Sequence, residues 1–290
     1  MPKTFKTIAL IGKYKSPEIA EPVLRLARFL HERGIRVLLD PLTAAHVGKN
    51  SYSVLPLEDV GREAELAIVI GGDGTMLNIA RTFAPFDVAL VGINQGRLGF
   101  LTDLSMGGML DAMAAILAGN FVEESRMLLQ AEVWSAEDSV LNVVSFNDIS
   151  VNKGAEGSLI EIEVHIDGKF VYNLRSDGLI VTSPTGSTAY ALSSGGPILH
   201  PSLNVIGLVP VCPHTLSNRP IVVGSESEIE ITILKAADAR VHFDSHSHHE
   251  LKERDKIMVR RCLHSIRLLH PLDHNYYHML REKLHWSETL

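Results

Sequence analysis

Residues 176–198 read SDGLIVTSPTGSTAYALSSGGPI, and this stretch decides how the second half of the chain folds. The apolar run 179–182 predicts a buried strand, and Pro184 ends it because proline fixes φ and lacks an N–H donor. Gly186 favours a turn that a side chain would resist, and residues 187–188 would then cap a short helix. A loop of small residues rich in N–H and O–H donors suits a ligand with many oxygen acceptors, such as a nucleotide. The alternative is an ordinary strand-to-helix turn.

The length of 290 residues favours about two domains, and a hydrophobic content of 46% is enough for sizeable cores. We expect no membrane span, since no apolar run reaches roughly 18 residues, and no signal peptide, since the first apolar run, 7–11, is too short. The net charge of −7 disfavours nucleic acid and anionic membranes as partners. Cys212 and Cys262 lie in apolar contexts, which favours free thiols in a reducing, cytoplasmic location.

Strands that alternate with helices predict an α/β domain over residues 1–125, with a mostly parallel, Rossmann-like sheet. The expected strands are 7–11, 35–39, 64–70 and 88–91, and the expected helices are 17–33, 76–82 and 108–118. The first helix has Ser16 as its predicted N-cap and ends at Gly34.

Short β-rich runs from residue 126 predict a mainly β, sandwich-like domain that extends to residue 272. The expected strands are 128–134, 140–146, 159–166, 170–174, 179–182, 205–209, 229–234, 240–243, 256–260 and 264–268. Asp167-Gly168 between two of these runs predicts a tight hairpin turn. The remaining residues, 273–290, predict an amphipathic helix that returns to pack on the first domain.

A glycine turn follows the third expected strand and reads Gly71-Gly72-Asp73-Gly74-Thr75. Open α/β sheets bind ligands at the carboxyl ends of parallel strands, and glycines at a helix N-terminus let phosphates approach the backbone. Beside phosphates, the Asp73 carboxylate could hold a metal ion or accept a proton from an attacking hydroxyl. The alternative is that it only caps the helix. The turn matches neither a P-loop nor the dinucleotide fingerprint.

Two further groups of polar residues are candidate binding positions, and a third group is not. Asn147 and Asp148 offer donors and acceptors that match an adenine edge and ribose hydroxyls, although a turn is the more common reason for such a pair. Arg175 could pair with phosphate or with Asp177. The histidine-rich segment 246–249 is predicted to be a solvated polar turn between strands rather than a metal site.

Together these motifs make the chain similar to the NAD kinase family, and in particular to its proteobacterial type. The resemblance covers nearly the whole chain and rests on residues 71–75, 92–100, 147–148 and 177–197. Its most specific part is TGSTAY at 185–190 followed by GGP at 195–197. The GGDGT motif alone is shared with diacylglycerol kinases and phosphofructokinases.

The resemblance implies that the adenosine 2′-hydroxyl of NAD attacks the γ-phosphoryl group of ATP, which gives NADP and ADP. It implies that Asp73 is the catalytic proton acceptor. The phosphate-binding residues that it implies are Gly71, Gly72, Gly74 and Thr75. The NAD-binding residues that it implies are Asp73, Gly74, Asn147, Asp148, Arg175, Asp177, Thr188, Ala189, Tyr190, Ala191, Leu192 and Ser193. It further implies a divalent cation, expected to be Mg²⁺ with its ligands left open, and a homodimer or homotetramer.

The resemblance also assigns parts of NAD to these residues. Asn147 and Asp148 would hold the adenosine part, Asp177 would face the nicotinamide side, and residues 188–193 would line the adenine and ribose pocket. Asp73 and the 188–193 segment are then expected to hold one dinucleotide in a shared cleft. The family often has Glu where this chain has Asp148.

Two other functions remain open. A lipid or sugar kinase of the same superfamily would share the glycine turn but would not need the 188–193 segment. A non-catalytic NAD-binding sensor would keep the pocket, but it has no use for a carboxylate such as Asp73 beside phosphates.

Overall fold

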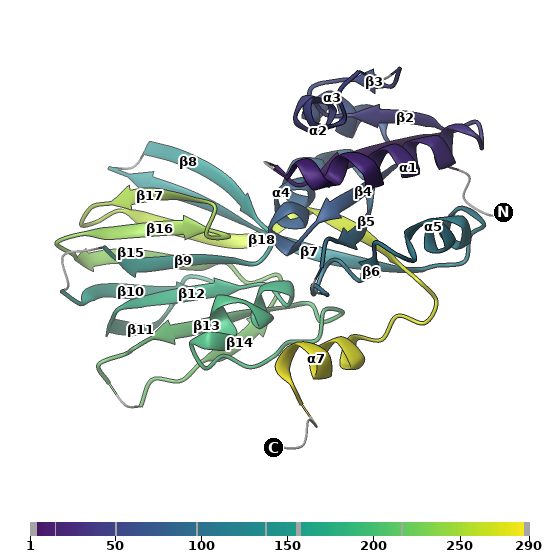
Figure 1. The fold of residues 1–290 in the computed structure, drawn as a ribbon. Coiled ribbons are helices and arrows are strands. Elements are labelled where there is room, and N and C mark those ends of the chain that lie inside the picture. Colours follow the sequence, from purple (N-terminus) through teal and green to yellow (C-terminus); the bar gives the residue numbers. More distant parts are fainter. Residues whose placement is uncertain are drawn as a thin grey trace. The chain divides into compact units, whose positions relative to one another are not determined.

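The fold was taken from a computed structural model that describes residues 5–14, 16–49, 51–96, 98–136, 138–154, 158–215 and 217–286. The chain divides into two compact units (Figure 1). Unit 1 consists of Met1–Ser125 and Ile266–Leu290, and unit 2 consists of Arg126–Ser265. In the described part of the chain, no helix combines the length and the apolar character needed to span a bilayer.

Unit 1 is built on a parallel sheet with the strand order β18-β5-β4-β1-β2-β3. Its strands are β1 (Thr7–Gly12), β2 (Arg36–Leu39), β3 (Ser53–Val54), β4 (Leu66–Gly71), β5 (Ala89–Asn94) and the C-terminal end of β18 (Lys256–His270), and β6 (Leu104–Ser105) pairs with β5. The chain moves outward from β1 in one direction to β2 and in the other to β4. The carboxyl ends of β1 and β4 therefore form a topological switch point, where open α/β sheets bind ligands.

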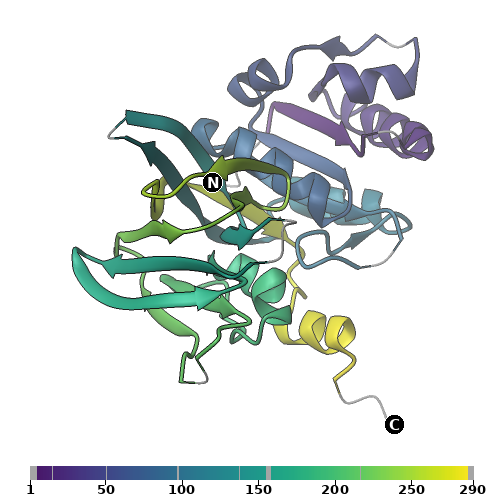
Figure 2. The ribbon, with the colours of Figure 1, turned by 90° about the vertical axis from the view of Figure 1, so that its left-hand side faces the viewer.

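Helices cover both faces of the parallel sheet (Figure 2). The helices of unit 1 are η1 (Pro17–Ile19), α1 (Ala20–His31), α2 (Pro41–Val47), α3 (Leu57–Glu63), α4 (Asp73–Phe83), η2 (Ala84–Phe86), α5 (Met109–Leu117) and α7 (Tyr276–Leu284), of which α7 lies away from the sheet. Leu26 of α1 and Met113 of α5 share one core cluster with Val91 of β5. Met76 of α4 packs instead beside the next residue, Gly92, because successive residues of a strand face opposite ways. Buried apolar surface on both faces explains why these strands are almost wholly hydrophobic.

Unit 2 is a sandwich of two antiparallel sheets that share one hydrophobic core. One sheet has the order β11-β10-β15-β18, with β7 pairing both β18 and β8, and the other has the order β14-β13-β12-β9-β16-β17. The strands are β7 (Val122–Ser135), β8 (Asp138–Ser145), β9 (Asp148–Lys153), β10 (Ile160–Ile166), β11 (Lys169–Ser176), β12 (Gly178–Thr182), β13 (Val205–Val211), β14 (Ile221–Gly224), β15 (Ile229–Lys235), β16 (Ala239–Phe243) and β17 (Ser247–Leu251). Strand β10 alternates buried and part-exposed residues, as expected of a strand with one face in the core.

Strand β12 is buried on both faces, which explains its continuous apolar sequence. Leu179 and Val181 face the sandwich core, whereas Ile180 packs in a second cluster with Ala191 and Val209. Ala191 belongs to α6 (Tyr190–Ser193), which follows the 3-10 helix η3 (Thr185–Thr188). The short helix therefore covers the outer face of β12.

The structure confirms the predicted fold class, an α/β unit with a parallel sheet and a mainly β unit, with the C-terminal helix packed in the first of them. Met279 and Leu280 of α7 are buried. The hairpin turn predicted at Asp167-Gly168 joins β10 and β11, and both residues have positive φ, 53° and 72°. Such a pair of left-handed residues gives a two-residue turn that matches the twist of the strands.

Several predicted element boundaries were wrong. Helix α4 begins at Asp73, three residues before the predicted start at Met76, and helices α2 and α3 were not predicted. The predicted strands 256–260 and 264–268 are one continuous strand, β18. The predicted N-cap Ser16 makes no side-chain cap bond, because the chain opens with the 3-10 turn η1 and the hydroxyl donates to Glu18.

Candidate functional site

The glycine turn lies where β4 ends and α4 begins. Gly72 is the N-cap of α4 in an extended conformation, and Asp73 is its first residue. Gly72 and Gly74 are exposed, and a Cβ atom added to either would meet no atom within 4 Å. Open space beside these two glycines at a helix N-terminus fits an anion that approaches the backbone. Gly71 has a different reason to be glycine, since its Cβ would lie 2.6 Å from Oγ1 of Thr75.

The Asp73 carboxylate is held by a loop from the same unit. Its Oδ2 accepts a hydrogen bond from the backbone N–H of Phe100 (2.9 Å), and its Oδ1 accepts one from Leu101 (3.0 Å). The hydroxyl of Thr102 lies 3.4 Å from Oδ1. Asp73 therefore does more than begin a helix: its side chain is fixed in one orientation. Oδ2, with a single donor, keeps a lone pair for a ligand.

Two glycines of the 92–100 motif let that loop reach Asp73. A Cβ on Gly99 would lie 2.2 Å from Oδ1 of Asp73, and a Cβ on Gly92 would lie 2.4 Å from the carbonyl oxygen of Leu101. Asn94, at the end of β5, donates to the carbonyl oxygens of Thr102 (3.3 Å) and Leu104 (3.0 Å). The sequence motif is thus explained by close approach of backbone to backbone around Asp73.

The hydroxyl-rich stretch of unit 2 is ordered by its own side chains, but not as predicted. Ser187 and Thr188 do not cap α6, because its N-cap is Ala189 and no side chain caps it. Both hydroxyls lie in η3 instead, where Ser187 donates to the carbonyl oxygen of Pro184 (2.7 Å) and accepts from the N–H of Leu199 (2.9 Å). These bonds fix the loop that precedes the 188–193 segment.

Gly186 joins this loop to the Asn147 motif. The turn excludes a side chain, as predicted, but the cause is close packing, because the φ of Gly186 is not in the left-handed region. A Cβ at this position would lie 2.1 Å from the carbonyl oxygen of Asn147. Ser183 strengthens the same contact, because its N–H donates to Asn147 O (2.9 Å) and its hydroxyl donates to Phe146 O (2.6 Å).

Asp148 lies beneath this junction with an unsatisfied carboxyl group. The residue is 3% exposed, and its Oδ1 is buried without a hydrogen-bond partner among the described residues. Burial, together with the charge of Asp244, raises the pKa of Asp148 from 3.8 to about 7. A ligand O–H or N–H that reached Oδ1 would remove the cost of leaving this atom unpaired.

Asp244 was not predicted as part of the site. Its carboxylate accepts hydrogen bonds from three successive backbone N–H groups, those of Phe146 (2.8 Å), Asn147 (2.7 Å) and Asp148 (3.1 Å). Asp244 and Ser245 both have positive φ. The Asp-Ser pair after an apolar strand was a sequence signal for a turn. The backbone N–H groups that the Asp244 carboxylate binds, however, lie about a hundred residues away in the sequence.

Tyr190 and Asp177 lie near Asp148 in unit 2. Burial first, and then the charges of Cys212, Asp148 and Asp177, raise the pKa of Tyr190. The carboxylate of Asp177 pairs with Lys153 at 2.7 Å, and not with Arg175 as the sequence had left open. The structure thus groups Asn147, Asp148, Asp177 and Tyr190 within one unit.

Arg175 stands apart from these contacts. It is exposed, and its Nε lies 3.8 Å from Oε1 of Glu161 on the neighbouring strand. A buried arginine nearby was missed: Arg126, at 3% exposure, donates to the hydroxyl of Thr185 (3.2 Å). In the sequence Arg126 only precedes an apolar run, which gives no sign of a binding role. The fold shows that β7 places its side chain against η3.

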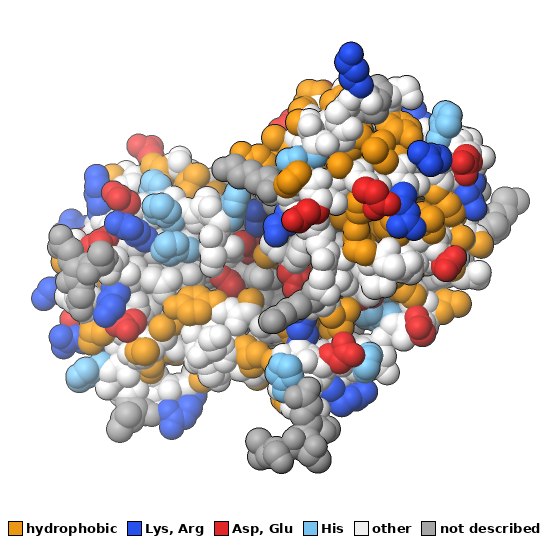
Figure 3. Space-filling view, viewed as in Figure 1, with side chains coloured by type: hydrophobic (Ala, Val, Ile, Leu, Met, Phe, Trp, Pro, Cys, Tyr) orange, Lys and Arg blue, Asp and Glu red, His pale blue; other side chains and the backbone are white. Residues whose placement is uncertain are grey.

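The prediction that the histidine-rich segment 246–249 is a turn between strands holds for His246 and is wrong for residues 247–249. Residues 247–251 form β17, which pairs with β16, and His248 lies opposite His242 with ring centroids 5.5 Å apart. Figure 3 shows histidine side chains gathered over these two strands. Burial and the charges of His248 and Arg240 lower the pKa of His242.

A surface hollow of about 720 Å³ in unit 2 is not part of the candidate site. Glu132, Trp134 and Arg260 are among the residues that line it, and none of the predicted site residues does. The basic side chains of Lys256 and Arg260 in its lining are paired with Glu230 and Glu132.

The chain is a two-unit α/β-plus-β protein. Its α/β unit has a parallel sheet with a glycine turn after β4, and its β unit is a sandwich in which β12 leads into a hydroxyl-rich loop. The ATP-NAD kinase N-terminal domain matches residues 8–121, and the ATP-NAD kinase C-terminal domain matches residues 146–270. The chain belongs to the ATP-NAD kinase family.

A relative and two solved structures agree with this assignment. The NAD kinase of Nitrosomonas eutropha is 60% identical over 286 residues, which cover 99% of this chain and 97% of the relative. The yeast NADH kinase complexed with NADH superimposes with a TM-score of 0.92 at 23% identity, over 99% of this chain and 90% of that one. An NAD kinase from Archaeoglobus fulgidus in complex with ATP gives a TM-score of 0.73 at 24% identity, over 96% and 98%. At these identities the two structures show a shared fold.

Proposed function

We propose that the chain transfers the γ-phosphoryl group of ATP to the adenosine 2′-hydroxyl of NAD, and that Asp73 accepts the hydroxyl proton. One observation carries the proposal: the Asp73 carboxylate, at the N-terminus of α4, is held through both oxygens by the N–H groups of Phe100 and Leu101. Similarity to the NAD kinase of Nitrosomonas eutropha supports the proposed reaction. The NADH and the ATP bound in the two solved structures support NAD and ATP as the proposed substrates.

A fixed carboxylate suits the proton transfer that this reaction needs. A ribose hydroxyl is a poor nucleophile and loses its proton as it attacks, and a positioned base contributes typically about 10²–10⁴-fold to the rate. Phosphoryl transfer has a loose transition state, so positioning of the two substrates accounts for most of the remaining catalysis. The loop 99–102 supplies that positioning for the base, because Asp73 cannot rotate without losing two hydrogen bonds.

Gly72 and Gly74 are the proposed contacts for phosphate oxygens. Their exposed backbone and the partial positive charge at the N-terminus of α4 favour an anion there. Gly71 and Thr75 would support this arrangement, since the glycine leaves room for the threonine hydroxyl. A substituted Gly72 or Gly74 would place a side chain in the space that the phosphates need.

The glycine turn fits a divalent cation such as Mg²⁺ that is held mainly by phosphate oxygens. Asp73 is the one carboxylate of the segment 71–75, and Mg²⁺ in phosphoryl-transfer sites is typically bound by one or two carboxylates together with substrate phosphates. Such a cation would offset the repulsion between Asp73 and the triphosphate.

Unit 2 would supply the adenosine site. The unpaired, buried Oδ1 of Asp148 calls for a donor such as a ribose hydroxyl, and the Asn147 side chain beside it offers both a donor and an acceptor. The 188–193 segment would line the pocket, with Tyr190 near both Asp148 and Asp177. We assign Asp177 to the nicotinamide side and place Arg175 at the edge of the site.

The assembly and location of the protein are further proposals. We propose a homodimer or homotetramer, as the family resemblance implies. We propose a cytoplasmic location because Cys212 and Cys262 are both free.

The test is a coupled assay for NADP formed from ATP, Mg²⁺ and NAD by the purified full chain. We expect NADP and ADP in equal amounts, and loss of both when NAD lacks its 2′-hydroxyl. ADP released on a lipid or a sugar, with no NADP, would favour another kinase of the superfamily. Binding of NAD without any turnover would favour a sensor.

A further inference from the structure

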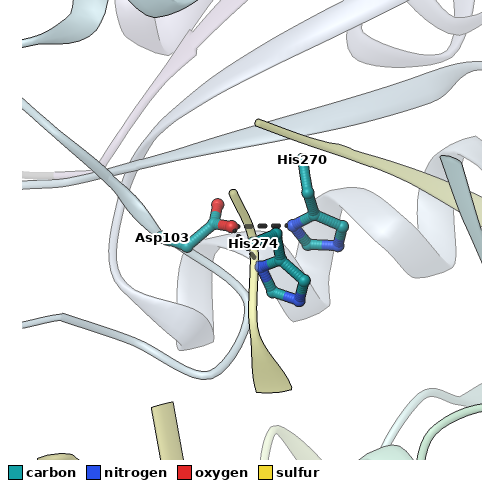
Figure 4. Close-up of side chains that lie close together, drawn as sticks. All are labelled: Asp103, His270 and His274. Atoms are coloured by element: carbon teal, nitrogen blue, oxygen red, sulfur yellow. Dashed lines mark hydrogen bonds and ion pairs between the residues drawn. The ribbon is translucent and has the colours of Figure 1, made fainter. Parts of the chain in front are cut away.

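Three side chains of unit 1 that can each bind a metal converge on one point outside the glycine turn (Figure 4). They are Asp103, which directly precedes β6, His270, the last residue of β18, and His274, in the link between β18 and α7. Oδ2 of Asp103 accepts a hydrogen bond of 2.8 Å from Nδ1 of His270 and another of 2.8 Å from Nδ1 of His274. One ligand atom from each residue lies within 4.8 Å of the other two.

The two imidazole rings are arranged to present the same nitrogen to the same oxygen. They stack with centroids 3.9 Å apart and an angle of 22° between their planes. Both Nδ1 atoms point at the carboxylate of Asp103 (Figure 4). Only 2% of the His270 side chain and 13% of the His274 side chain are exposed, so this geometry is set by packing rather than by a mobile surface.

The Asp103 carboxylate is incompletely satisfied. Its side chain is 12% exposed, and its Oδ1 is buried without a hydrogen-bond partner among the described residues. A buried oxygen that lacks a donor costs free energy unless another group satisfies it. A cation bound to both oxygens of Asp103, or a water held by a cation on Oδ2, would supply that group.

Glu124 lies close to the position of the outer carboxylate that metal-binding histidines usually have. Its Oε2 lies 3.3 Å from Nε2 of His270, on the side of the ring opposite to Asp103. A carboxylate on the far nitrogen fixes the tautomer and the orientation of the ring, and raises its basicity as a ligand. This second carboxylate comes from β7, a different element from those that carry the three ligands.

A hollow of about 210 Å³ beside the cluster offers a way in. Asp103 and His274 line it, together with His278 and Glu282 of α7. An ion could enter from this side, and water could complete its coordination there.

We propose that Asp103, His270 and His274 form a binding site for Zn²⁺. Two imidazole nitrogens and one carboxylate oxygen are a usual ligand set for zinc, whereas Mg²⁺ and Ca²⁺ prefer oxygen ligands alone. Zinc sits about 2.0–2.2 Å from such atoms, which places tetrahedral ligands about 3.3 Å apart. The three side chains therefore open by about half an ångström, and each histidine binds through an unprotonated Nδ1 while its remaining proton is on Nε2. An imidazolium ring reaches this state by releasing its Nδ1 proton to solvent, and a neutral ring by moving that proton to Nε2.

Zinc at this point would join segments that are distant in the sequence. Asp103 lies two residues after Leu101, whose N–H holds Asp73, and His274 leads directly into α7. The ion would thus clamp the C-terminal helix of unit 1 to the loop that orients Asp73.

The test measures Zn²⁺ binding by the full chain after removal of metal with a chelator, in excess Mg²⁺ and without ATP or NAD. We expect about one equivalent by calorimetry, and Co²⁺ in its place should give the visible absorption bands of a tetrahedral site. His274→Ala should weaken Zn²⁺ binding by more than about 100-fold, and Glu124→Gln by about 10–100-fold. Asp103→Asn serves as a second variant if His274→Ala does not fold.

His248→Ala is the control for adventitious binding to the histidines of β16 and β17. This variant should bind Zn²⁺ as the wild type does. The proposal is overturned if wild type and His274→Ala bind Zn²⁺ equally, or if His248→Ala is the variant that loses it. Because no nucleotide is present, these outcomes are independent of whether the protein phosphorylates NAD.

Discussion

Gly186 and Asn147 meet backbone to backbone, and a Cβ on the glycine would lie 2.1 Å from the asparagine carbonyl oxygen. This contact joins the Asn147 motif to the hydroxyl-rich loop, although the two lie about forty residues apart in the sequence. It also ties η3 to the start of β9, because the N–H of Ser183 donates to the same carbonyl oxygen. The space at Gly186 is filled by main chain, which cannot move aside as a flexible side chain can.

Gly186→Ala should therefore destabilise the protein. The added methyl group forces the η3 loop away from Asn147, and overpacking of this kind costs typically about 1–3 kcal/mol. Urea unfolding would measure the loss, and the KM for NAD should rise in the folded fraction. Gly224→Ala is the matched control, because a Cβ there meets no atom within 4 Å. Equal stability of the two variants would contradict the contact.

Asp73→Asn should abolish most turnover and leave NAD binding intact. An amide cannot accept the hydroxyl proton, so we expect kcat to fall by about 10²–10⁴-fold. The comparison is Thr102→Val, which removes only the 3.4 Å hydroxyl contact and keeps the carboxylate. Steady-state kinetics together with NAD titration would separate the two effects. A kcat near that of the wild type would exclude Asp73 as the base.

Gly99→Ala should lower activity by displacing the Asp73 carboxylate. Its Cβ would lie 2.2 Å from Oδ1, so the side chain or the loop must shift. Misplacement of a catalytic group by about 1 Å can cost roughly 100-fold in rate. Gly96→Ala is the control: it lies three positions before Gly99, a Cβ there meets no atom within 4 Å, and the variant should stay near wild type. An active Gly99→Ala enzyme would show that the orientation of Asp73 does not matter.

Asp148 should make stability depend on pH. Its carboxyl titrates at 3.8 in the unfolded chain and at about 7 in the folded protein, so the folded state holds the proton more tightly between these values. The stability that the protonated carboxyl contributes is therefore fully present below pH 3.8 and is lost as the pH rises through about 7. The total loss in the free energy of unfolding is at most about 4 kcal/mol.

Asp148→Asn tests this dependence, because the amide does not titrate. The free energy of unfolding of the wild type, measured with urea between pH 4 and pH 8, should fall relative to that of the variant as the pH rises. A constant difference across that range would show that Asp148 is already ionised in the folded protein at low pH.

Local patterns predicted the elements whose sequence shows a regular hydrophobic period or a turn signal. The strand 66–71 and the turn at Asp167-Gly168 are examples. Helix α2 was missed although Asp40 and Pro41 are a cap and a first helical residue, and Asp40 does accept from the N–H groups of Leu42 and Thr43. That helix was within reach of sequence reasoning.

The remaining errors concern contacts between distant residues. Gly186 carries no sign of the Asn147 carbonyl that excludes a side chain, and Gly99 carries none of the Asp73 oxygen beside it. The polar run 247–251 becomes a strand only because β16 offers it a partner. Tertiary pairing overrides the low strand propensity of such a sequence.

The segment 99–103 holds Asp73 near one end and supplies Asp103 at the other. Its length is therefore constrained independently of its composition. An inserted or deleted residue would put one of the two ends out of register, whatever amino acids were chosen. Loop grafts and affinity tags in unit 1 should accordingly be tolerated elsewhere on its surface before they are tolerated within these five positions.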